Sequence, residues 1–175
     1  KGGTHFIMEV SSHGIAQSRV EGIDFDVKCL TNISQDHLDY HQTVEAYRQV
    51  KMDFISHYPG NSILEKDYQE IEMVAHPFLS GTFNELNLKA AAAILLKLGF
   101  EKERVYHALK RVSAVKGRYE LIDSDTDFDV VVDFAHTPEG LDIVLEHAKQ
   151  QAELKNGRLL VCFGCGGDRD RLKRP

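Results

Sequence analysis

Residues 5–13 read His5-Phe6-Ile7-Met8-Glu9-Val10-Ser11-Ser12-His13, and this stretch decides the fold. The apolar run 5–10 predicts a buried strand that carries an acid near its end. A second apolar run, 26–33, likewise ends on polar side chains, Asn32 and Ser34. Ligands and ions bind at the carboxyl ends of strands in open α/β sheets. The two clusters of polar side chains therefore predict a metal-assisted site at one edge of a sheet.

Strand and helix signals alternate along the rest of the chain. Further strands are predicted at 119–122, 129–133 and 158–163, and helices at 43–56, 84–98, 102–112 and 137–153. This alternation predicts an α/β fold with a mostly parallel sheet flanked by helices. The connector at 113–118 divides the chain into units 1–113 and 114–175. The weakly patterned block 58–79 predicts short strands or irregular structure.

The composition is that of an ordinary globular protein. The chain has 175 residues, of which 42% are hydrophobic. A net charge of −6 argues against binding to a phosphate backbone, so we expect no nucleic-acid partner. No run approaches the length of a membrane span, so we expect no membrane insertion. Three cysteines make no disulfide framework and fit a reducing cytoplasm. The ends at Lys1 and Pro175 lead us to expect a fragment of a longer protein.

Lys51 lies in the middle of an apolar stripe. At about 100° per residue, Val44, Tyr47, Phe54 and Ile55 share one face of the predicted helix. One interpretation is a snorkelling lysine, whose stem packs while its ammonium reaches water. The other is a lysine aimed into a site, where a buried ammonium loses its charge or pairs with acids. A neutral lysine amine also takes up carbon dioxide, and the resulting carbamate is an oxygen donor suited to magnesium.

Polar residues at two helix starts are further candidates. Asn84 is most simply a helix N-cap and Asn87 an ordinary polar residue, although both amides could instead reach a ligand. Asp133 and His136 follow an apolar strand and precede the helix start at Thr137, which is a natural anion site. His136 could also be a satisfied loop histidine.

The glycine-rich turn 164–167 is followed by basic residues that could meet phosphate. These are Arg169, Arg171, Lys173 and Arg174. The turn is not a Walker A sequence, and no Walker A sequence occurs in this chain. By itself, such a turn is weak evidence for a nucleotide site.

In this order, these segments resemble the Mur ligases of peptidoglycan synthesis, most closely their UDP-N-acetylmuramoyl-tripeptide synthetase (MurE) branch. The resemblance rests on MEVSSH (8–13), TNISQDHLDYH (31–41), Lys51, FNELN (83–87), GRYE (117–120), VVDFAHTP (131–138) and FGCGGDRD (163–170). The first two are specific to that branch. The asparagine, histidine and glycine motifs also occur in other Mur ligases and in folylpolyglutamate synthetase. The resemblance implies a truncated central ATPase-like domain over 1–113 and the start of a Rossmann-like C-terminal domain over 114–175.

The activity that the resemblance implies is that of an ATP-dependent, ADP-forming ligase. Such an enzyme adds diaminopimelate or lysine to UDP-N-acetylmuramoyl-L-alanyl-D-glutamate through an acyl phosphate. Magnesium and ATP would be required, and the partners would be ATP, the UDP-muramoyl-dipeptide and the amino acid. A cytoplasmic monomer that serves cell-wall synthesis, cell shape and cell division is expected.

The resemblance also implies roles for single residues. Glu9 and His37 match magnesium ligands, and Lys51 matches the lysine that the family carries as a carbamate, which also serves the metal. These three would form the catalytic centre. Substrate contacts are implied for Ser11, Gln17 and Arg19, and the nucleotide-facing set is implied to be Asn84, Asn87, Arg118, Asp133 and His136.

Some features depart from the family pattern. The expected P-loop would precede Lys1, and the motif that selects the amino acid would follow Pro175, so the chain alone is expected to be inactive. The span from Lys51 to Phe83 is shorter than expected. Phe134 replaces a usual tyrosine and Leu172 a usual glycine.

Three alternatives to this type of ligase stay open on the sequence. The first is another Mur ligase or a folylpolyglutamate synthetase-like ligase. The second is a non-catalytic binding module, which the shortened middle favours. The third is a metal-dependent hydrolase, because His37-x-Asp39-x-His41 has the spacing of a zinc or di-metal ligand set.

Overall fold

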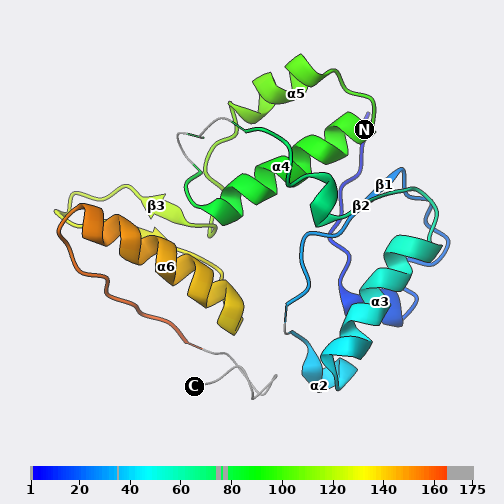
Figure 1. Ribbon diagram of the computed structural model, residues 1–175, viewed down its shortest axis with the longest axis horizontal. Coiled ribbons are helices and arrows are strands. Elements are labelled where there is room, and N and C mark those ends of the chain that lie inside the picture. Colours follow the sequence, from blue (N-terminus) through cyan, green and yellow to red (C-terminus); the bar gives the residue numbers. More distant parts are fainter. Residues whose placement is uncertain (1, 35, 74–75, 77–78, 165–175) are drawn as a thin grey trace.

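The structure, a computed structural model, describes residues 2–34, 36–73, 76 and 79–164. Its elements fall into three groups along the chain (Figure 1). The first group contains α1 (Ser12–Ala16), β1 (Val27–Cys29), α2 (Leu38–His41), α3 (Val44–His57) and β2 (Asn61–Ile63). A short 3-10 helix, Glu65–Asp67, leads to the second group, α4 (Thr82–Lys97) and α5 (Lys102–Leu109). The third group contains β3 (Glu120–Ile122), β4 (Val130–Val132) and α6 (Pro138–Leu154).

A βαβ unit organises the first group. β1 and β2 pair in parallel, with Lys28 opposite Ser62, and α2 and α3 lie in the connection between them. Parallel neighbours require such a crossover because the chain must return to the same end of the sheet. α3 begins after Thr43, whose hydroxyl accepts a hydrogen bond from the Ala46 N–H at 3.1 Å. The prediction of a helix over 43–56 is therefore confirmed.

Lys28 joins β1 to the end of α3. Its side chain is buried, with 3% of its surface exposed. Its ammonium donates to the carbonyl oxygens of Ile55 at 2.8 Å, Phe54 at 3.3 Å and Tyr58. The last carbonyls of a helix have no partner within the helix, and an ammonium supplies three donors. Burial removes water from around the Lys28 ammonium and thereby lowers its pKa. The three carbonyl oxygens replace part of that lost water.

α4 packs against both of its neighbours. Leu88 and Ala92 of α4 form one core cluster with Val105 and Leu109 of α5. On the other side, Ala90 and Ala93 pack with Ile63 and with Tyr68, whose hydroxyl donates to the Thr31 carbonyl oxygen at 2.8 Å. Burial raises the pKa of Tyr68 to about 12. The small alanine side chains explain how α4 approaches β2 and α5 closely at the same time.

The third group begins with an antiparallel hairpin. β3 pairs with β4, with Leu121 opposite Val131. α6 begins at Pro138, and the hydroxyl of its N-cap Thr137 accepts from the Gly140 N–H at 3.1 Å. The predicted elements at 119–122, 129–133 and 137–153 are therefore confirmed.

The α/β class is confirmed, but the described sheets are small. They are two separate pairs, one parallel and one antiparallel, instead of one mostly parallel sheet. Within the described chain, no strand forms at 5–10 or 158–163, and the run 26–33 yields only β1. A strand needs a neighbour for its backbone hydrogen bonds, and neither run is paired with one. Phe6, Ile7 and Leu160 accordingly stay 86%, 94% and 83% exposed.

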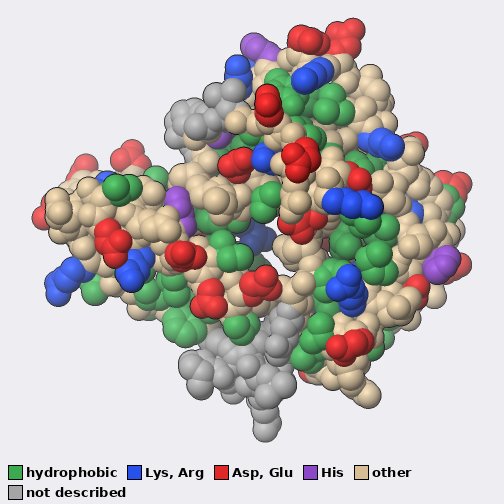
Figure 2. Space-filling view, viewed as in Figure 1, with side chains coloured by type: hydrophobic (Ala, Val, Ile, Leu, Met, Phe, Trp, Pro, Cys, Tyr) green, Lys and Arg blue, Asp and Glu red, His purple; other side chains and the backbone are tan. Residues whose placement is uncertain are grey.

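The surface mixes charge and apolar area. On the face drawn in Figure 2, lysine and arginine side chains lie scattered among carboxylates, and green apolar patches interrupt them. Within the described residues, no helix combines the length and apolar character needed to cross a membrane.

Replacing Lys28 by methionine tests whether its hydrogen bonds stabilise the C-terminal end of α3. The apolar stem is kept, but three carbonyl oxygens lose their donor. We expect the free energy of unfolding to fall by about 2–3 kcal/mol, measured from the midpoint of urea unfolding. Lys66→Met, at an exposed position of the 3-10 helix, serves as the matched control and should change stability by less than about 0.5 kcal/mol. Equal midpoints for the two variants would show that the Lys28 hydrogen bonds contribute nothing.

Candidate functional site

Three histidines and two tyrosines from α1, α2 and α3 pack together. We call His13, His37, Tyr40, His41 and Tyr47 the histidine cluster. The His13 ring lies at its centre, with ring centroids 4.6 Å from His37, 4.3 Å from Tyr40 and 5.6 Å from His41. The rings of His13 and His37 are perpendicular. Two short helices that the sequence analysis did not predict, α1 and α2, bring these side chains together.

His41 is the buried member of the cluster. Its Nε2 shares a hydrogen bond of 2.9 Å with the Ser12 hydroxyl, and the two residues are 9% and 1% exposed. Burial, and then the positive charges that His13 and His37 can carry, lower the pKa of His41. A neutral imidazole is therefore favoured at this position near pH 7.

His37 caps the start of α2 in an uncommon backbone conformation. Its φ is 56°, in the left-handed region, where histidine is one of the more frequent residues. Its N–H donates to the Asp36 carboxylate at 2.7 Å, and its Nε2 lies 3.5 Å from the other oxygen of that carboxylate. Asp36 thus contacts both the backbone and the ring of His37.

Lys51 and His37 meet the same aromatic ring. The Lys51 ammonium lies 5.0 Å from the centre of the Tyr47 ring, and the His37 ring lies 6.4 Å from it. Lys51 is half-buried, whereas the neighbouring stripe residues Tyr47, Phe54 and Ile55 are buried. Val44 departs from the predicted stripe, because it is 39% exposed at the start of α3.

Glu9 is not gathered into this cluster. It is exposed on the extended segment before α1 and makes no hydrogen bond or ion pair with the described residues. Nor do any three histidine, cysteine or acidic side chains in the described chain lie close enough to hold a metal ion. Within the described residues, the spacing His37-x-Asp39-x-His41 thus does not bring three such side chains together.

The three residues matched to substrate contacts border α1. The Ser11 hydroxyl caps this helix by accepting from the Gly14 N–H at 3.1 Å. Gln17 is the C-cap residue, and Arg19 lies two positions after it. All three are exposed and close in sequence to the buried Ser12.

Three of the residues matched to nucleotide contacts meet beside the β3–β4 hairpin. The Asp133 carboxylate accepts from the N–H groups of Ala135 at 2.6 Å and Tyr119 at 2.7 Å. The Arg118 guanidinium lies 5.2 Å from the centre of the Phe134 ring, and His136 Nδ1 lies 3.1 Å from the Phe134 carbonyl oxygen. Arg118 and His136 are exposed, so both can reach an anion.

Asn84 and Asn87 lie at the start of α4. The interpretation of Asn84 as an N-cap was wrong, because α4 begins at Thr82 after Gly81. Asn84 instead lies inside the first turn, 4% exposed, and its amide donates to the Ser80 carbonyl oxygen at 2.9 Å. Asn87 is exposed. The two amides therefore differ in burial, and only the Asn87 side chain is open to solvent.

His147, a residue that no motif marks, joins α6 to the start of α4. Its ring lies 4.7 Å from Tyr119 and 5.9 Å from Phe83, and its Nε2 lies 3.2 Å from the Ser80 hydroxyl. Burial lowers its pKa. Phe83, which precedes Asn84, also packs against Tyr119, with ring centroids 5.9 Å apart, so the start of α4 lies next to the residue that follows Arg118.

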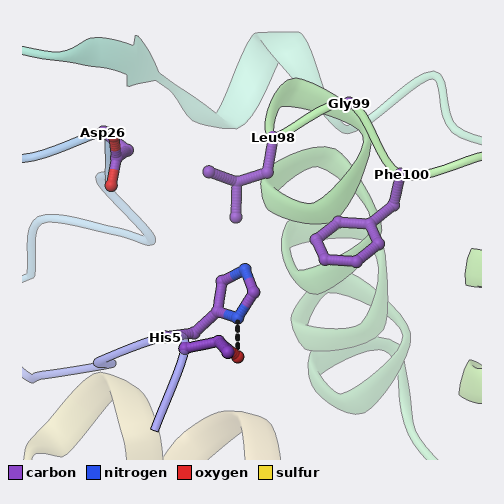
Figure 3. Close-up of a pocket in the computed structure, with 6 residues that line it drawn as sticks. His5, Asp26, Leu98, Gly99 and Phe100 are labelled. Atoms are coloured by element: carbon purple, nitrogen blue, oxygen red, sulfur yellow. Dashed lines mark hydrogen bonds between the residues drawn. The ribbon is translucent and has the colours of Figure 1, made fainter. Parts of the chain in front are cut away.

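Two cavities lie away from the predicted residues. One, of about 320 Å³, is lined by Thr4, His5, Asp26, Leu98, Gly99 and Phe100. In Figure 3 the His5 ring points into it, held by a 2.9 Å hydrogen bond to the Thr4 hydroxyl. The other, of about 570 Å³, is lined by Glu72, Met73, Glu85, Lys89, Lys102 and Tyr106. Neither is lined by a residue to which the sequence analysis assigned a role in the site.

Some predictions concern residues outside the described part of the chain. The basic residues after the glycine turn belong there: Arg169, Arg171, Lys173 and Arg174. Cys165 and Leu172 lie there too. Cys29 and Cys162 are free thiols.

Comparison with known proteins identifies two domain families. Residues 1–76 match the Mur ligase middle domain, and residues 117–175 match the Mur ligase glutamate ligase domain. The chain is 36% identical, over 97% of its length, to the UDP-N-acetylmuramoyl-L-alanyl-D-glutamate–2,6-diaminopimelate ligase of Bacillus velezensis. It is 37% identical over 98% of its length to the enzyme of that name in Fusobacterium nucleatum, and 35% over 97% to that in Gloeobacter violaceus.

The chain covers less than half of these relatives. It spans 44% of the Bacillus velezensis and Fusobacterium nucleatum proteins and 43% of the Gloeobacter violaceus protein. The first alignment extends over 220 positions, more than the 175 residues of this chain. The relative therefore contains residues with no counterpart here, in agreement with a shortened segment.

The contact made by His147 should be sensitive to pH. Its folded-state pKa lies below the ordinary 6.5, so the unfolded chain binds the proton more readily. Stability should be fully present above pH 6.5 and fall as the pH drops from there towards the folded-state pKa. An NMR titration of the ring should give a midpoint below 6.5, and His147→Phe should reduce the pH dependence of urea unfolding. A midpoint at or above 6.5 would contradict the burial of this ring.

Proposed function

The chain belongs to the Mur ligase family, and on that premise we propose that it contributes the residues that bind the metal ion and the substrate carboxylate in an ATP-dependent ligase. The reaction joins diaminopimelate to UDP-N-acetylmuramoyl-L-alanyl-D-glutamate. ATP phosphorylates the substrate carboxylate, the amino group of the amino acid attacks the acyl phosphate, and ADP and phosphate leave. Relatives named for this reaction support the choice of amino acid. Lysine is the alternative that the assay below separates.

The convergence of His37 and Lys51 on the Tyr47 ring carries this proposal. These residues are separated by 14 positions: His37 is the N-cap of α2, and Lys51 belongs to α3. Phosphoryl transfer needs positive charge and fixed geometry more than covalent help from the protein. His37 and Lys51 can carry positive charge or bind a metal ion, and both contact the rigid Tyr47 ring, so together they meet that need.

Glu9, His37 and Lys51 would hold the magnesium ion in this proposal, with Lys51 as a carbamate. The Lys51 ammonium first loses a proton, and the neutral amine then forms a bond to the carbon of CO₂ and releases a second proton, which leaves an anionic oxygen donor. The ligand set would then contain two oxygen donors and one imidazole. Magnesium would supply charge neutralisation on the transferring phosphoryl group. The exposed position of Glu9 leaves its carboxylate accessible, although it does not contact the other two residues.

The remaining residues receive roles by their location. Ser11, Gln17 and Arg19 would contact the muramoyl-dipeptide beside α1. We assign the nucleotide to the surface between the start of α4 and the β3–β4 hairpin, with Asn87, Arg118, Asp133 and His136 as contacts and the buried Asn84 beneath them. We place the domain boundary between 113 and 114, in the irregular segment between α5 and β3.

ATP and UDP-linked precursors also define where the enzyme would act. Both are cytoplasmic metabolites, so we propose a cytoplasmic enzyme of cell-wall synthesis, with consequences for cell shape and division. We propose that it acts as a monomer, with these small molecules as its partners.

The proposed reaction can be tested with the product of the complete reading frame that encodes this chain. We expect ADP release that requires both UDP-N-acetylmuramoyl-L-alanyl-D-glutamate and diaminopimelate, and much slower release with lysine. Mass spectrometry should show one new amide. Phosphate release without an amino acid would support a hydrolase instead. Ligand binding with no turnover would support a binding module, and both results would contradict the ligase.

Removal of the Lys51 amine should abolish the reaction. We expect Lys51→Ala to lower kcat by at least about 100-fold, because misplaced phosphoryl-binding groups cost rates of this order. Short carboxylic acids added to this variant should restore part of the rate by replacing the carbamate oxygens. Arg48→Ala, at an exposed position of the same helix, is the control and should retain its rate. Unchanged turnover in Lys51→Ala would remove the carbamate role.

A further inference from the structure

We infer that Ser12 and His41 form a positioning pair that sets the separation between Ser11 and His37 in the ligase site. The inference rests on the proposed function, which makes Ser11 a substrate contact and His37 a metal ligand. Ser12 and His41 themselves have no assigned role in that function. Each is adjacent to an assigned residue, either in sequence or through a hydrogen bond.

The bond between the pair is short, buried and distant in sequence. The Ser12 hydroxyl and His41 Nε2 are 2.9 Å apart, and 29 positions separate the two residues. Only 1% of Ser12 and 9% of His41 is exposed. A buried polar group that loses its partner is left without water to replace it, so such a bond strongly favours one arrangement.

Each member of the pair is tied directly to a proposed site residue. Ser12 is the first residue of α1 and follows the N-cap Ser11. His41 is the last residue of α2, and its backbone N–H donates to the His37 carbonyl oxygen at 2.9 Å. A displacement of either partner is therefore passed to Ser11 or to His37.

α2 depends on such contacts for its location. It has four residues, and its flanking residues His37 and Gln42 both have positive φ, at 56° and 67°. A single turn is not stable by itself, because too few backbone hydrogen bonds offset its ordering. The bond to Ser12 and the ring contact of His41 with Tyr47, at 5.5 Å, hold it against α1 and α3. The Tyr47 ring in turn contacts the Lys51 ammonium.

Steady-state ligation by the full reading-frame product tests the pair. Ser12→Ala and His41→Phe should each lower kcat by about 10- to 100-fold, because the reactants are bound but misaligned. KM for the muramoyl-dipeptide should change by less than about threefold. The double variant should be no slower than the slower single variant, since both changes remove the same bond. His41→Gln, which keeps a donor and an acceptor, should recover most of the rate.

Ser62→Ala is the matched control. It also removes a hydroxyl that donates a hydrogen bond, to the Ile55 carbonyl oxygen at 2.6 Å, but it lies on β2 outside the histidine cluster. It should lose stability while keeping kcat. Equal kcat losses in Ser62→Ala and Ser12→Ala would show a general stability effect and overturn the inference.

The NMR signals of the His37 ring, recorded without substrate, metal or nucleotide, provide a readout that does not depend on activity. They should shift in Ser12→Ala and in His41→Phe and stay unchanged in Ser62→Ala. If the unsubstituted protein shows no ligation, the proposed function fails, while these signals still decide whether the pair positions His37. His37 signals unchanged in both pair variants would overturn the pair. If Ser12→Ala does not fold, His41→Phe, which keeps a ring in the buried position, decides by itself.

Discussion

The parallel pairing of β1 with β2 is the constraint on which the first group of elements depends. A parallel pair forces the intervening chain to cross from one end of the strands to the other, and α3 makes that crossing. Lys28 then connects the strand to the helix by donating to the carbonyls at the end of α3. Its charge is tolerated in a buried place because backbone oxygens replace water. With α3 held at this end, Tyr47 in its second turn contacts His41 of α2.

In the histidine cluster, tertiary contacts fix the positions of two helices that are too short to be stable by themselves. α1 and α2 have five and four residues, too few to be stable alone. Ring packing around His13 and the hydrogen bond between Ser12 and His41 bind them to each other and to α3. These polar and aromatic contacts add to the apolar cluster in which Ile15 of α1 packs against Phe54 and Ile55 of α3.

Long helices with strong local signals could be predicted from the sequence. Strands, which need a neighbouring strand, were harder to predict. Thr43 and Thr137 mark helix starts by their capping hydroxyls, so α3 and α6 could be located to within a residue or two. The predicted strand at 5–10 failed because hydrophobicity predicts that a run can be buried, not that a neighbour exists for it. Asn84 was misassigned because Gly81 and Thr82 extend α4 one turn earlier. His147 was missed because its environment comes from Ser80, Phe83 and Tyr119, which are far from it in sequence.

By itself, the sequence determined the α/β class, the main helices, the family resemblance and the chemical types available to the site, because these depend on local patterns and residue identity. Only the tertiary structure decided which of those residues meet. It brought His37 and Lys51 to one tyrosine ring, left Glu9 apart from both, and paired Ser12 with His41. Such contacts join positions up to 29 residues apart, and their existence depends on the crossing of helices and the pairing of strands. No local pattern encodes those distances, so the site could be proposed from the sequence but assembled only in three dimensions.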